Sequence, residues 1–294
     1  MLAILIQNAE CKSVAYDIDT DSLSLLCFHA ISIQANRIPT SDERNPFPLQ
    51  HRIDSGTVFP MATLLEALCA FINGECGCIS ITGSGGKTTA LTALALHYAK
   101  FGKRVLVSTT TKLELPRLRD YGCDIYYSDE RVFRHTPKQG ERVFYACEGK
   151  DKALAPPLSH LETLMDFYDV LVLEADGARH KPLKLHSDCD PVVPDFTTST
   201  LAVMGMSGWG QELGRCCFGW NQDGHRVADD EAYLYLLHHQ DGVLKGAAGR
   251  TLVLCNQAEN TGSETMTTLA RSLDAIPIYF GSLQTNTLLF RKEP

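Results

Sequence analysis

Short runs of apolar residues alternate with longer amphipathic stretches along most of this chain. Short runs rich in Val, Ile and Leu are typical of buried strands, whereas apolar positions three and four residues apart predict helices. The expected strands are residues 78–82, 104–108, 141–147, 170–173, 201–206, 251–255 and 276–280. The expected helices are residues 88–101, 158–167, 229–239 and 263–272, with another that opens at Met61 and ends at Gly74. Because buried strands that alternate with helices form parallel sheets, the pattern predicts a three-layer α/β fold, a mostly parallel sheet with helices on both faces.

The first sixty residues lack this alternation. Residues 37–55 are polar and proline-bearing without an apolar period, which predicts a loop or disorder. Helical spacing begins only at Met61. We therefore expect two parts: residues 1–60, a poorly folded N-terminal extension or the product of a mispredicted start, and residues 61–294, one α/β domain.

Composition narrows the class of protein. Hydrophobic residues make up 44% and charged residues 21% of the 294 positions, as in ordinary globular domains. The formal net charge of −8 argues against a chain that coats nucleic acid or an anionic membrane, so phosphate binding must come from a local site. No segment approaches the ~20 apolar residues of a membrane span, and the N-terminus lacks the basic lead of a signal peptide. We expect a cytoplasmic protein.

The eleven cysteines are scattered and form no CxxC pair. Most fall in apolar runs, which favours small buried side chains in a reducing cytosol. Cys76 with Cys78, and Cys216 with Cys217, could serve a metal or a sulfur carrier. No His or Cys stands nearby at ligand spacing, however, which favours plain packing.

A glycine-rich turn lies between the first expected strand and the helix that follows it. The longer phosphate-loop pattern GxxxxGK[ST] would need glycine where this chain has Ile81, but a loop two residues shorter, GSGGKTT, is intact. Its amides and the helix N-terminus favour phosphate, Lys87 would reach the β and γ phosphates, and the Thr88 hydroxyl would bind Mg²⁺. An ordinary glycine turn that caps the helix is the alternative. The predicted nucleotide-binding residues are Gly83, Ser84, Gly85, Gly86, Lys87, Thr88 and Thr89.

Two carboxylates end another expected strand, in the run DVLVLEADG at residues 169–177. Glu174 and Asp176 would lie on the same side of an extended chain. Either could hold Mg²⁺, with Thr88, while the other orients the attacking nucleophile, so the predicted catalytic residues are Lys87, Glu174 and Asp176. The alternative is a turn that acidic residues merely cap.

Two further polar clusters follow expected strands. In the STTTK turn at residues 108–112, Thr110, Thr111 and Lys112 could contact phosphate or substrate oxygens. Beyond the acidic pair, Arg179, Lys181 and Lys184 could neutralise charge on a transferred phosphoryl group. The alternatives are a solvated turn for the first cluster and exposed surface charges for the second.

These motifs together resemble the YqeC family, described as selenium-dependent hydroxylase accessory proteins. The resemblance rests on GSGGKTT, STTTK and the run EADGARHKPLKLHSDCDPVVP, continues through His225-Arg226, residues 242–249 and residues 281–283, and covers residues 62–285. It implies a nucleotide-binding accessory factor in the maturation of selenium-dependent molybdenum hydroxylases or the synthesis of their selenium cofactor. Where relatives have an NKxD-like run, this chain has Asn256-Gln257-Ala258-Glu259, which weakens a preference for GTP over ATP.

Three functional hypotheses follow. The first is a Mg²⁺-dependent enzyme that hydrolyses ATP or GTP, with the nucleotide and a molybdenum hydroxylase client, or its cofactor, as partners. The second is an ATP-dependent ligase or small-molecule kinase, because the short loop resembles that of Mur ligases; a phosphorylated intermediate would distinguish it. The third is a non-catalytic switch that binds a client in a nucleotide-dependent manner without phosphate release.

Overall fold

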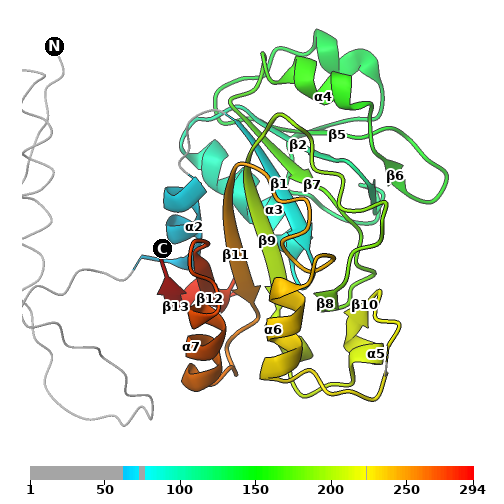
Figure 1. Ribbon diagram of the computed structural model, residues 1–294. Coiled ribbons are helices and arrows are strands. Elements are labelled where there is room, and N and C mark those ends of the chain that lie inside the picture. The colour runs from blue at the N-terminus through cyan, green and yellow to red at the C-terminus, as the bar shows by residue number, and fades with distance from the viewer. Residues whose placement is uncertain (1–61, 73–76, 223) are drawn as a thin grey trace, which may run out of the picture. The chain divides into compact units, whose positions relative to one another are not determined.

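The computed structural model describes residues 62–72, 77–222 and 224–294 (Figure 1). Within these ranges, the core of the protein is a nine-stranded sheet with the order β13-β12-β11-β9-β1-β7-β2-β5-β4. Every neighbouring pair is parallel except β12 with β13. The strands are β1 (Gly77–Gly83), β2 (Val105–Thr109), β4 (Ile125–Tyr127), β5 (Arg142–Tyr145), β7 (Val170–Glu174), β9 (Thr197–Gly205), β11 (Arg250–Asn256), β12 (Ile278–Ser282) and β13 (Thr287–Lys292).

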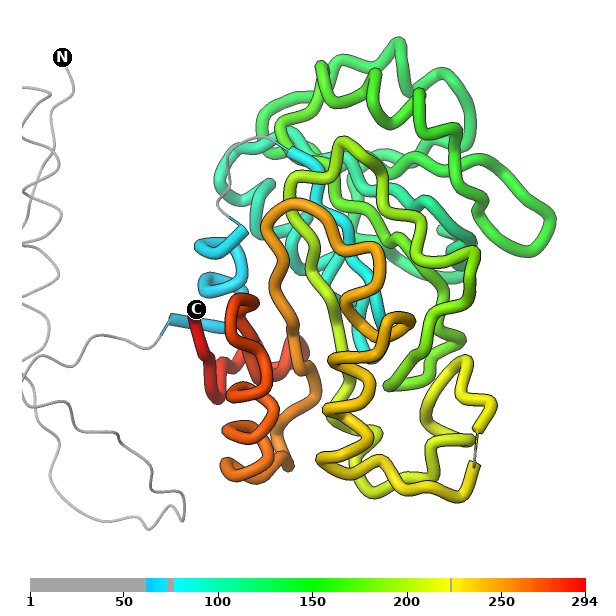
Figure 2. The backbone as a smooth tube through the Cα atoms, viewed as in Figure 1, coloured from blue at the N-terminus to red at the C-terminus, as the bar shows by residue number. Residues whose placement is uncertain are grey.

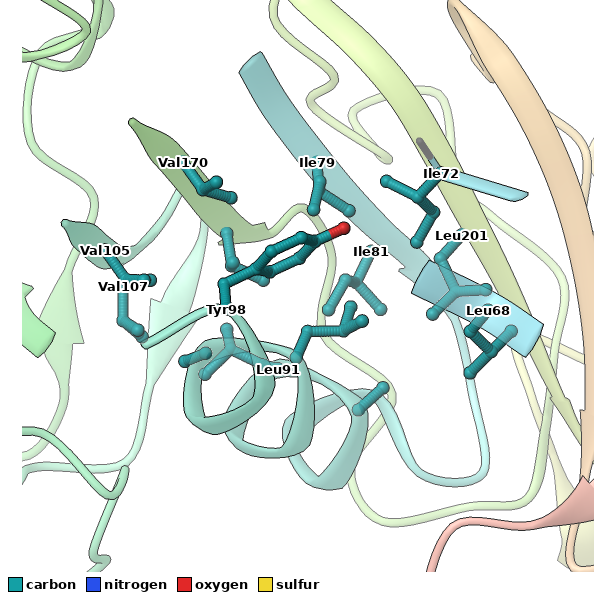
Figure 3. Close-up of a cluster of buried hydrophobic side chains, with 14 of the residues drawn as sticks. Leu68, Ile72, Ile79, Ile81, Leu91, Tyr98, Val105, Val107, Val170 and Leu201 are labelled. Carbon is teal, nitrogen blue, oxygen red and sulfur yellow. The ribbon is translucent and has the colours of Figure 1, made fainter. Parts of the chain in front are cut away.

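Helices cover both faces of the sheet, so the predicted three-layer α/β fold is confirmed. Helices α2 (Leu64–Ile72) and α3 (Lys87–Lys100) pack on one face. Helices α4 (Leu158–Leu164), α6 (Asp230–His238) and α7 (Ser263–Arg271) pack on the other. Figure 3 shows the first interface, where apolar side chains of α2 and α3 meet the strands.

Strand alternation explains why each strand serves two cores. Ile79 and Ile81 of β1 point toward α3, whereas Cys78 belongs to the cluster beneath α4 (Figure 3). On α3, Leu91 and Tyr98 lie on the buried face at helical spacing and contact this first core. An apolar residue at nearly every strand position is what a sheet covered on both faces requires.

Local signals set the helix ends. Thr63 and Glu66 form a capping box at the start of α2, in which each side chain accepts a hydrogen bond from the other residue's amide, at 3.3 and 2.8 Å. The Asp229 carboxylate accepts from the Ala232 amide at 3.0 Å and begins α6. The C-terminal segment lies beside α2 (Figure 2), where the Leu65 amide donates to Asn286 Oδ1 at 2.9 Å.

The sequence-based boundaries agree for most elements, with three informative differences. Strand β9 begins four residues before the predicted 201, because most polar side chains of its first half are buried and hydrogen-bonded: Thr197 bonds Ser80 at 2.8 Å. Strand β13 was not predicted, because its residues alternate between exposed and half-buried at an antiparallel edge. Strand β4 has three residues at the other edge.

Several short elements complete the described part of the chain. Two small sheets pair β3 (Lys112–Leu113) with β6 (Ala153–Leu154) and β8 (Leu183–Lys184) with β10 (Cys217–Phe218). Short helical turns are η2 (Glu130–Arg134), η3 (Met206–Gly208) and α5 (Leu213–Cys216). The predicted extension at residues 1–60 and the predicted helix end at Gly74 lie outside the described residues.

Chain order places one strand end at a special position. From β1 the chain runs to β2, then to the edge strand β4, back to β5 and then to β7 beside β1, before it crosses to β9 on the other side of β1. The carboxyl end of β1 therefore lies where the strand order reverses. In open parallel sheets this is where ligands bind.

Cysteine packing follows the expectation for the described part of the chain. Cys78, Cys216, Cys217 and Cys255 are buried free thiols, and burial raises the pKa of Cys78 to about 12. Among the residues that the structure describes, no group of three His, Cys, Asp or Glu residues is arranged to hold a metal, and no helix is long and apolar enough to cross a membrane. Cys76 lies outside the described residues.

Candidate phosphate and magnesium site

The loop between β1 and α3 has a backbone that only glycine adopts easily. Gly83, Gly85 and Gly86 have φ of 86°, 80° and 132°. A Cβ on Gly83 would lie 2.1 Å from the Val203 carbonyl oxygen, and one on Gly85 would lie 2.4 Å from the Gly205 Cα. The three glycines are therefore required for the turn, and Gly83 and Gly85 are also required for its close packing against β9.

The Lys87 ammonium group is folded beneath this loop. The side chain is 5% exposed, and Nζ donates to the Gly83 carbonyl at 2.7 Å. It lies 3.0 Å from Asp176 Oδ1 and 4.0 Å from Glu174 Oε1. The sequence-predicted lysine and acidic pair thus meet in one cluster.

Thr88 and Glu174 join the helix start to the adjacent strand end. Because β7 pairs directly with β1, Glu174 lies opposite Ile81, and its Oε2 accepts a hydrogen bond from Thr88 Oγ1 at 2.8 Å. Burial raises the pKa of Glu174, although the charge of Lys87 and the hydrogen bond from Thr88 act in the opposite direction. Both side chains line the same cavity.

Asp176 is turned away from that cavity, and its side chain is fully buried. Its Oδ2 accepts from the Gly83 amide at 2.8 Å and lies 2.6 Å from His186 Nε2 and 3.5 Å from Lys184 Nζ. Burial opposes ionisation, but the His186 hydrogen bond and the charges of Lys87 and Lys184 outweigh it and lower the pKa of Asp176 to about 2.

His186 was not identified from the sequence. Its Nδ1 lies 2.9 Å from the Gly242 carbonyl, and its Nε2 faces the ionised Asp176. Both neighbours are oxygen atoms that can accept a hydrogen bond, so both ring nitrogens have a partner. The imidazole thus contacts Oδ2 of Asp176, whereas Lys87 contacts Oδ1. No spacing in the sequence signals it, since the pairing depends on how the chain returns to the sheet.

Lys184 and Lys181 use their ammonium groups within the protein. Lys184 donates to the Gly177 carbonyl at 2.7 Å and pairs with Asp190. Lys181 lines the cavity, but its Nζ donates to the carbonyls of Gly214 and Cys217 at 3.0 and 3.2 Å. In this structure neither ammonium group is turned toward the loop amides.

The STTTK turn divides in the same way. Thr110 is buried, and its hydroxyl donates to the Val192 carbonyl at 2.6 Å. The Thr111 amide donates to Thr109 Oγ1 at 3.0 Å, whereas Lys112 is exposed and lines the cavity with Arg179. Of the residues predicted from the two polar clusters, Lys112 and Arg179 have exposed side chains that line the cavity.

Asn256, predicted from the sequence only as part of a base-recognition run, contacts the glycine loop instead. At the end of β11, its Nδ2 donates to the Gly85 carbonyl at 2.8 Å, and its Oδ1 accepts from the Leu283 amide at 2.9 Å. Asn256 therefore fixes the phosphate loop to the end of β12. Gln257 beside it has φ of 60° and accepts a hydrogen bond from Ser207 at 2.6 Å.

The loop opens onto a cavity of about 390 Å³, a size that suits a small organic ligand. Six cationic side chains and only two carboxylates, Glu114 and Glu174, line it, although the whole chain has a net charge of −8. The local charge therefore favours an anion. The cations are Lys87, Lys112, Arg119, Lys152, Arg179 and Lys181.

The donor set at one end of the cavity fits Mg²⁺. The Thr88 hydroxyl and the Glu174 carboxylate lie side by side and supply the oxygen ligands that this ion prefers. Asp176 does not fit as a direct ligand in this arrangement, because its oxygens face Lys87, His186 and the Gly83 amide.

Sheet order, the glycine loop and the helix that follows it define an α/β protein of the P-loop NTPase-like fold. The family model described as YqeC protein matches residues 79–221, a range that holds the loop and both carboxylates. Residues 79–221 are therefore similar to the YqeC family. An Escherichia coli (strain K12) protein described as "Uncharacterized protein YqeC" is 31% identical over 132 residues, which are 43% of this chain and 51% of that protein. The match spans about half of the relative's length.

Proposed function

We propose that this protein binds a Mg²⁺–nucleoside triphosphate at residues 83–89 and cleaves its terminal phosphate. The observation that carries the proposal is the 2.8 Å contact between Thr88 and Glu174 on the cavity into which the loop opens. A hydroxyl at the start of the loop helix beside a carboxylate on the adjacent strand is the arrangement that a phosphate-bound Mg²⁺ requires.

The loop residues bind and orient the phosphates in this proposal. Amides of the glycine turn and the N-terminus of α3 favour negative charge. Lys87 must leave Asp176 to reach a phosphate, and Asp176 then keeps His186 and Lys184 as partners. An unpaired buried charge would be strongly destabilising, but these two partners keep the Asp176 carboxylate paired.

Thr88 and Glu174 hold the metal side of the site. When bound, Mg²⁺ would supply charge neutralisation at the phosphate oxygens. Glu174 also orients the attacking nucleophile, directly or through water, because it is the carboxylate of the strand-end pair that reaches the cavity. Asp176 positions Lys87 and the Gly83 amide from behind the loop.

Isothermal titration of ATP and GTP, each with and without Mg²⁺, tests this proposal together with phosphate release. We expect tight binding of at least one nucleotide in Mg²⁺, weakened about tenfold or more by Lys87→Ala because a charged contact is lost. Lys100→Ala is the matched control, since Lys100 is exposed at the other end of α3. Wild-type protein that binds neither nucleotide would overturn the proposal, and binding without turnover would favour the nucleotide switch instead.

We further propose, from the family, that this activity serves the maturation of selenium-dependent molybdenum hydroxylases or the synthesis of their selenium cofactor. The support is the match of residues 79–221 to the family model described as YqeC protein. Cells whose only copy carries Lys87→Ala should make hydroxylase with less selenium, measured by mass spectrometry of the purified enzyme. An unchanged selenium content would remove this role and leave nucleotide binding unaffected.

Phosphoryl transfer to a second molecule, as in a ligase or small-molecule kinase, is the second candidate. It is favoured by the cations that line the cavity beyond the loop. Acceptor-dependent formation of a phosphorylated product, rather than free phosphate, would distinguish transfer from hydrolysis.

A further inference from the structure

We infer that the cavity binds a second, anionic ligand beside the nucleotide, and that Lys112 of β3 and Lys152, directly before β6, hold it. This inference rests on the proposed function, because it assigns the phosphate loop to the nucleotide. The ligand class is a small molecule that carries a phosphate ester or a carboxylate.

The small sheet builds a rigid support for these two lysines. Leu113 of β3 and Ala153 of β6 lie opposite each other, and both are buried in the core beneath α3. Lys112 precedes Leu113 and Lys152 precedes Ala153, so both lysines are fixed at their backbones by a buried neighbour. Both are exposed, and both line the cavity. The wall is thus formed by strands, although its cations extend into solvent.

The other cations of the cavity already have partners. Arg119 lies 3.6 Å from Glu114, and Arg179 lies over the Phe218 ring at 5.4 Å. Lys87 and Lys181 bind carbonyls. Within residues 62–72, 77–222 and 224–294, neither Lys112 nor Lys152 has a carboxylate within ion-pair distance.

Two unpaired ammonium groups on one concave wall repel each other and attract an anion. The triphosphate in the loop would be neutralised by Lys87, the loop amides and the metal held by Thr88 and Glu174. Lys112 and Lys152 come from other elements, after β2 and before α4. Neither of them is needed to neutralise the triphosphate in the loop. An ammonium group binds phosphate and carboxylate oxygens as a point charge, which sets the ligand class.

The test uses full-length protein labelled with [¹⁵N]lysine, saturated with Mg²⁺ and a non-hydrolysable triphosphate, and titrated with inorganic phosphate or with succinate. Lys112→Ala and Lys152→Ala each identify their own amide signal by its absence. We expect the two wall signals to shift with the anion. We also expect the Lys112→Ala/Lys152→Ala double variant to weaken anion binding at least tenfold while nucleotide affinity stays within about twofold. Lys100→Ala/Lys138→Ala, at exposed positions elsewhere, is the control.

The outcomes separate the two claims. A shift with phosphate alone assigns a phosphate ester, and a shift with succinate as well assigns a broader oxyanion site. Loss of nucleotide affinity in the double variant, or displacement of the nucleotide by the anion, would overturn the inference, because the lysines would then serve the triphosphate. If wild-type protein binds no nucleotide, the proposed function fails, and the anion titration is repeated on the free protein. Anion-dependent shifts of the Lys112 and Lys152 signals, together with loss of anion binding in the double variant, would then still support the anion site.

Discussion

Asn256, at the end of β11, donates a hydrogen bond of 2.8 Å to the Gly85 carbonyl in the phosphate loop, a residue 171 positions earlier in the chain. Its other amide atom accepts from Leu283. The carboxyl ends of three strands, β1, β11 and β12, are thereby joined through one side chain. The shape of the loop therefore depends on a residue outside the loop motif.

Replacing Asn256 should loosen the loop. Asn256→Ala leaves the Gly85 carbonyl and the Leu283 amide without their partner, at a cost of about 1–3 kcal/mol. We expect a lower free energy of unfolding and about tenfold weaker nucleotide binding, measured by urea denaturation and calorimetry. Asn260→Ala is the matched control, because Asn260 is exposed and does not line the cavity. Equal effects from both variants would contradict a specific role of Asn256.

The hydroxyl of Thr88 should determine the metal dependence of binding. Thr88→Val keeps the shape of the side chain but removes the oxygen that bonds Glu174. We expect nucleotide affinity without Mg²⁺ to change little and the gain on adding Mg²⁺ to fall about tenfold or more. Thr88→Ser should retain the gain. If Thr88→Val and wild-type protein respond equally to Mg²⁺, the metal site is misassigned.

We expect ionised Glu174 to lower the free energy of unfolding of the ligand-free protein, although the proposed activity requires this carboxylate. Burial raises the pKa of this carboxyl, so the folded state holds its proton more tightly than the unfolded chain does. The resulting stabilisation is present at low pH and is lost as the pH rises through the folded pKa, because ionisation of this buried carboxyl disfavours the folded state. Glu174→Gln should therefore match or exceed wild type in free energy of unfolding at pH 7 but abolish Mg²⁺-dependent turnover. A loss of several kcal/mol on this substitution would show that the ionised carboxylate stabilises the fold.

Asp176 should behave in the opposite way. Its pKa in the folded state, about 2, lies below the usual 3.8, so its stabilisation is fully present above pH 3.8 and is lost as the pH falls through about 2. The shift corresponds to about 2 kcal/mol. Denaturation curves between pH 2 and 7 should show this slope in wild type and lack it in Asp176→Asn.

The same variant should be less stable at neutral pH. Asp176→Asn leaves Lys87, Lys184 and His186 facing a neutral group in a buried cluster, which costs about 3–5 kcal/mol. Asp124→Asn removes a partly exposed pair with Arg142 and should cost no more than about 1 kcal/mol. A similar loss in both variants would argue against the buried cluster as the cause.

Gly85 should be intolerant of any side chain. Gly85 and Gly102 have nearly the same φ, 80° and 77°, but a Cβ on Gly102 meets nothing within 4 Å, whereas one on Gly85 meets the Gly205 backbone at 2.4 Å. Gly102→Ala should therefore cost about 1–2 kcal/mol for backbone strain alone. Gly85→Ala should cost clearly more in free energy of unfolding, and equal losses would show that the close approach is unimportant.

Most of the fold was predictable because its central strands are apolar. Runs such as residues 170–173 are buried on both faces, and nothing but a covered parallel sheet accommodates them. The edge strands β4 and β13 were not predictable, because they have partly exposed positions and therefore lack a continuous apolar run. The polar first half of β9 was missed because its hydroxyls are paired only after folding.

The site was predictable only in its local parts. The loop and the strand-end acids are short motifs, and adjacency of β1 and β7 joins them. The expectation that Glu174 and Asp176 share a side assumed an extended chain, but β7 ends at Glu174, and Asp176 turns beneath the loop. His186 was beyond reach, because its contact with Asp176 depends on the return of the chain through β8.

Asp176 competes with any incoming anion for the ammonium group of Lys87, because the two side chains form an ion pair in the free protein. Any anion that enters must exchange places with an internal carboxylate before the ammonium group can bind it. A ligand with a single weakly held phosphate gains little from that exchange, whereas a polyphosphate gains several loop amides at once. In the proposed function, this exchange would favour a nucleoside triphosphate over free phosphate.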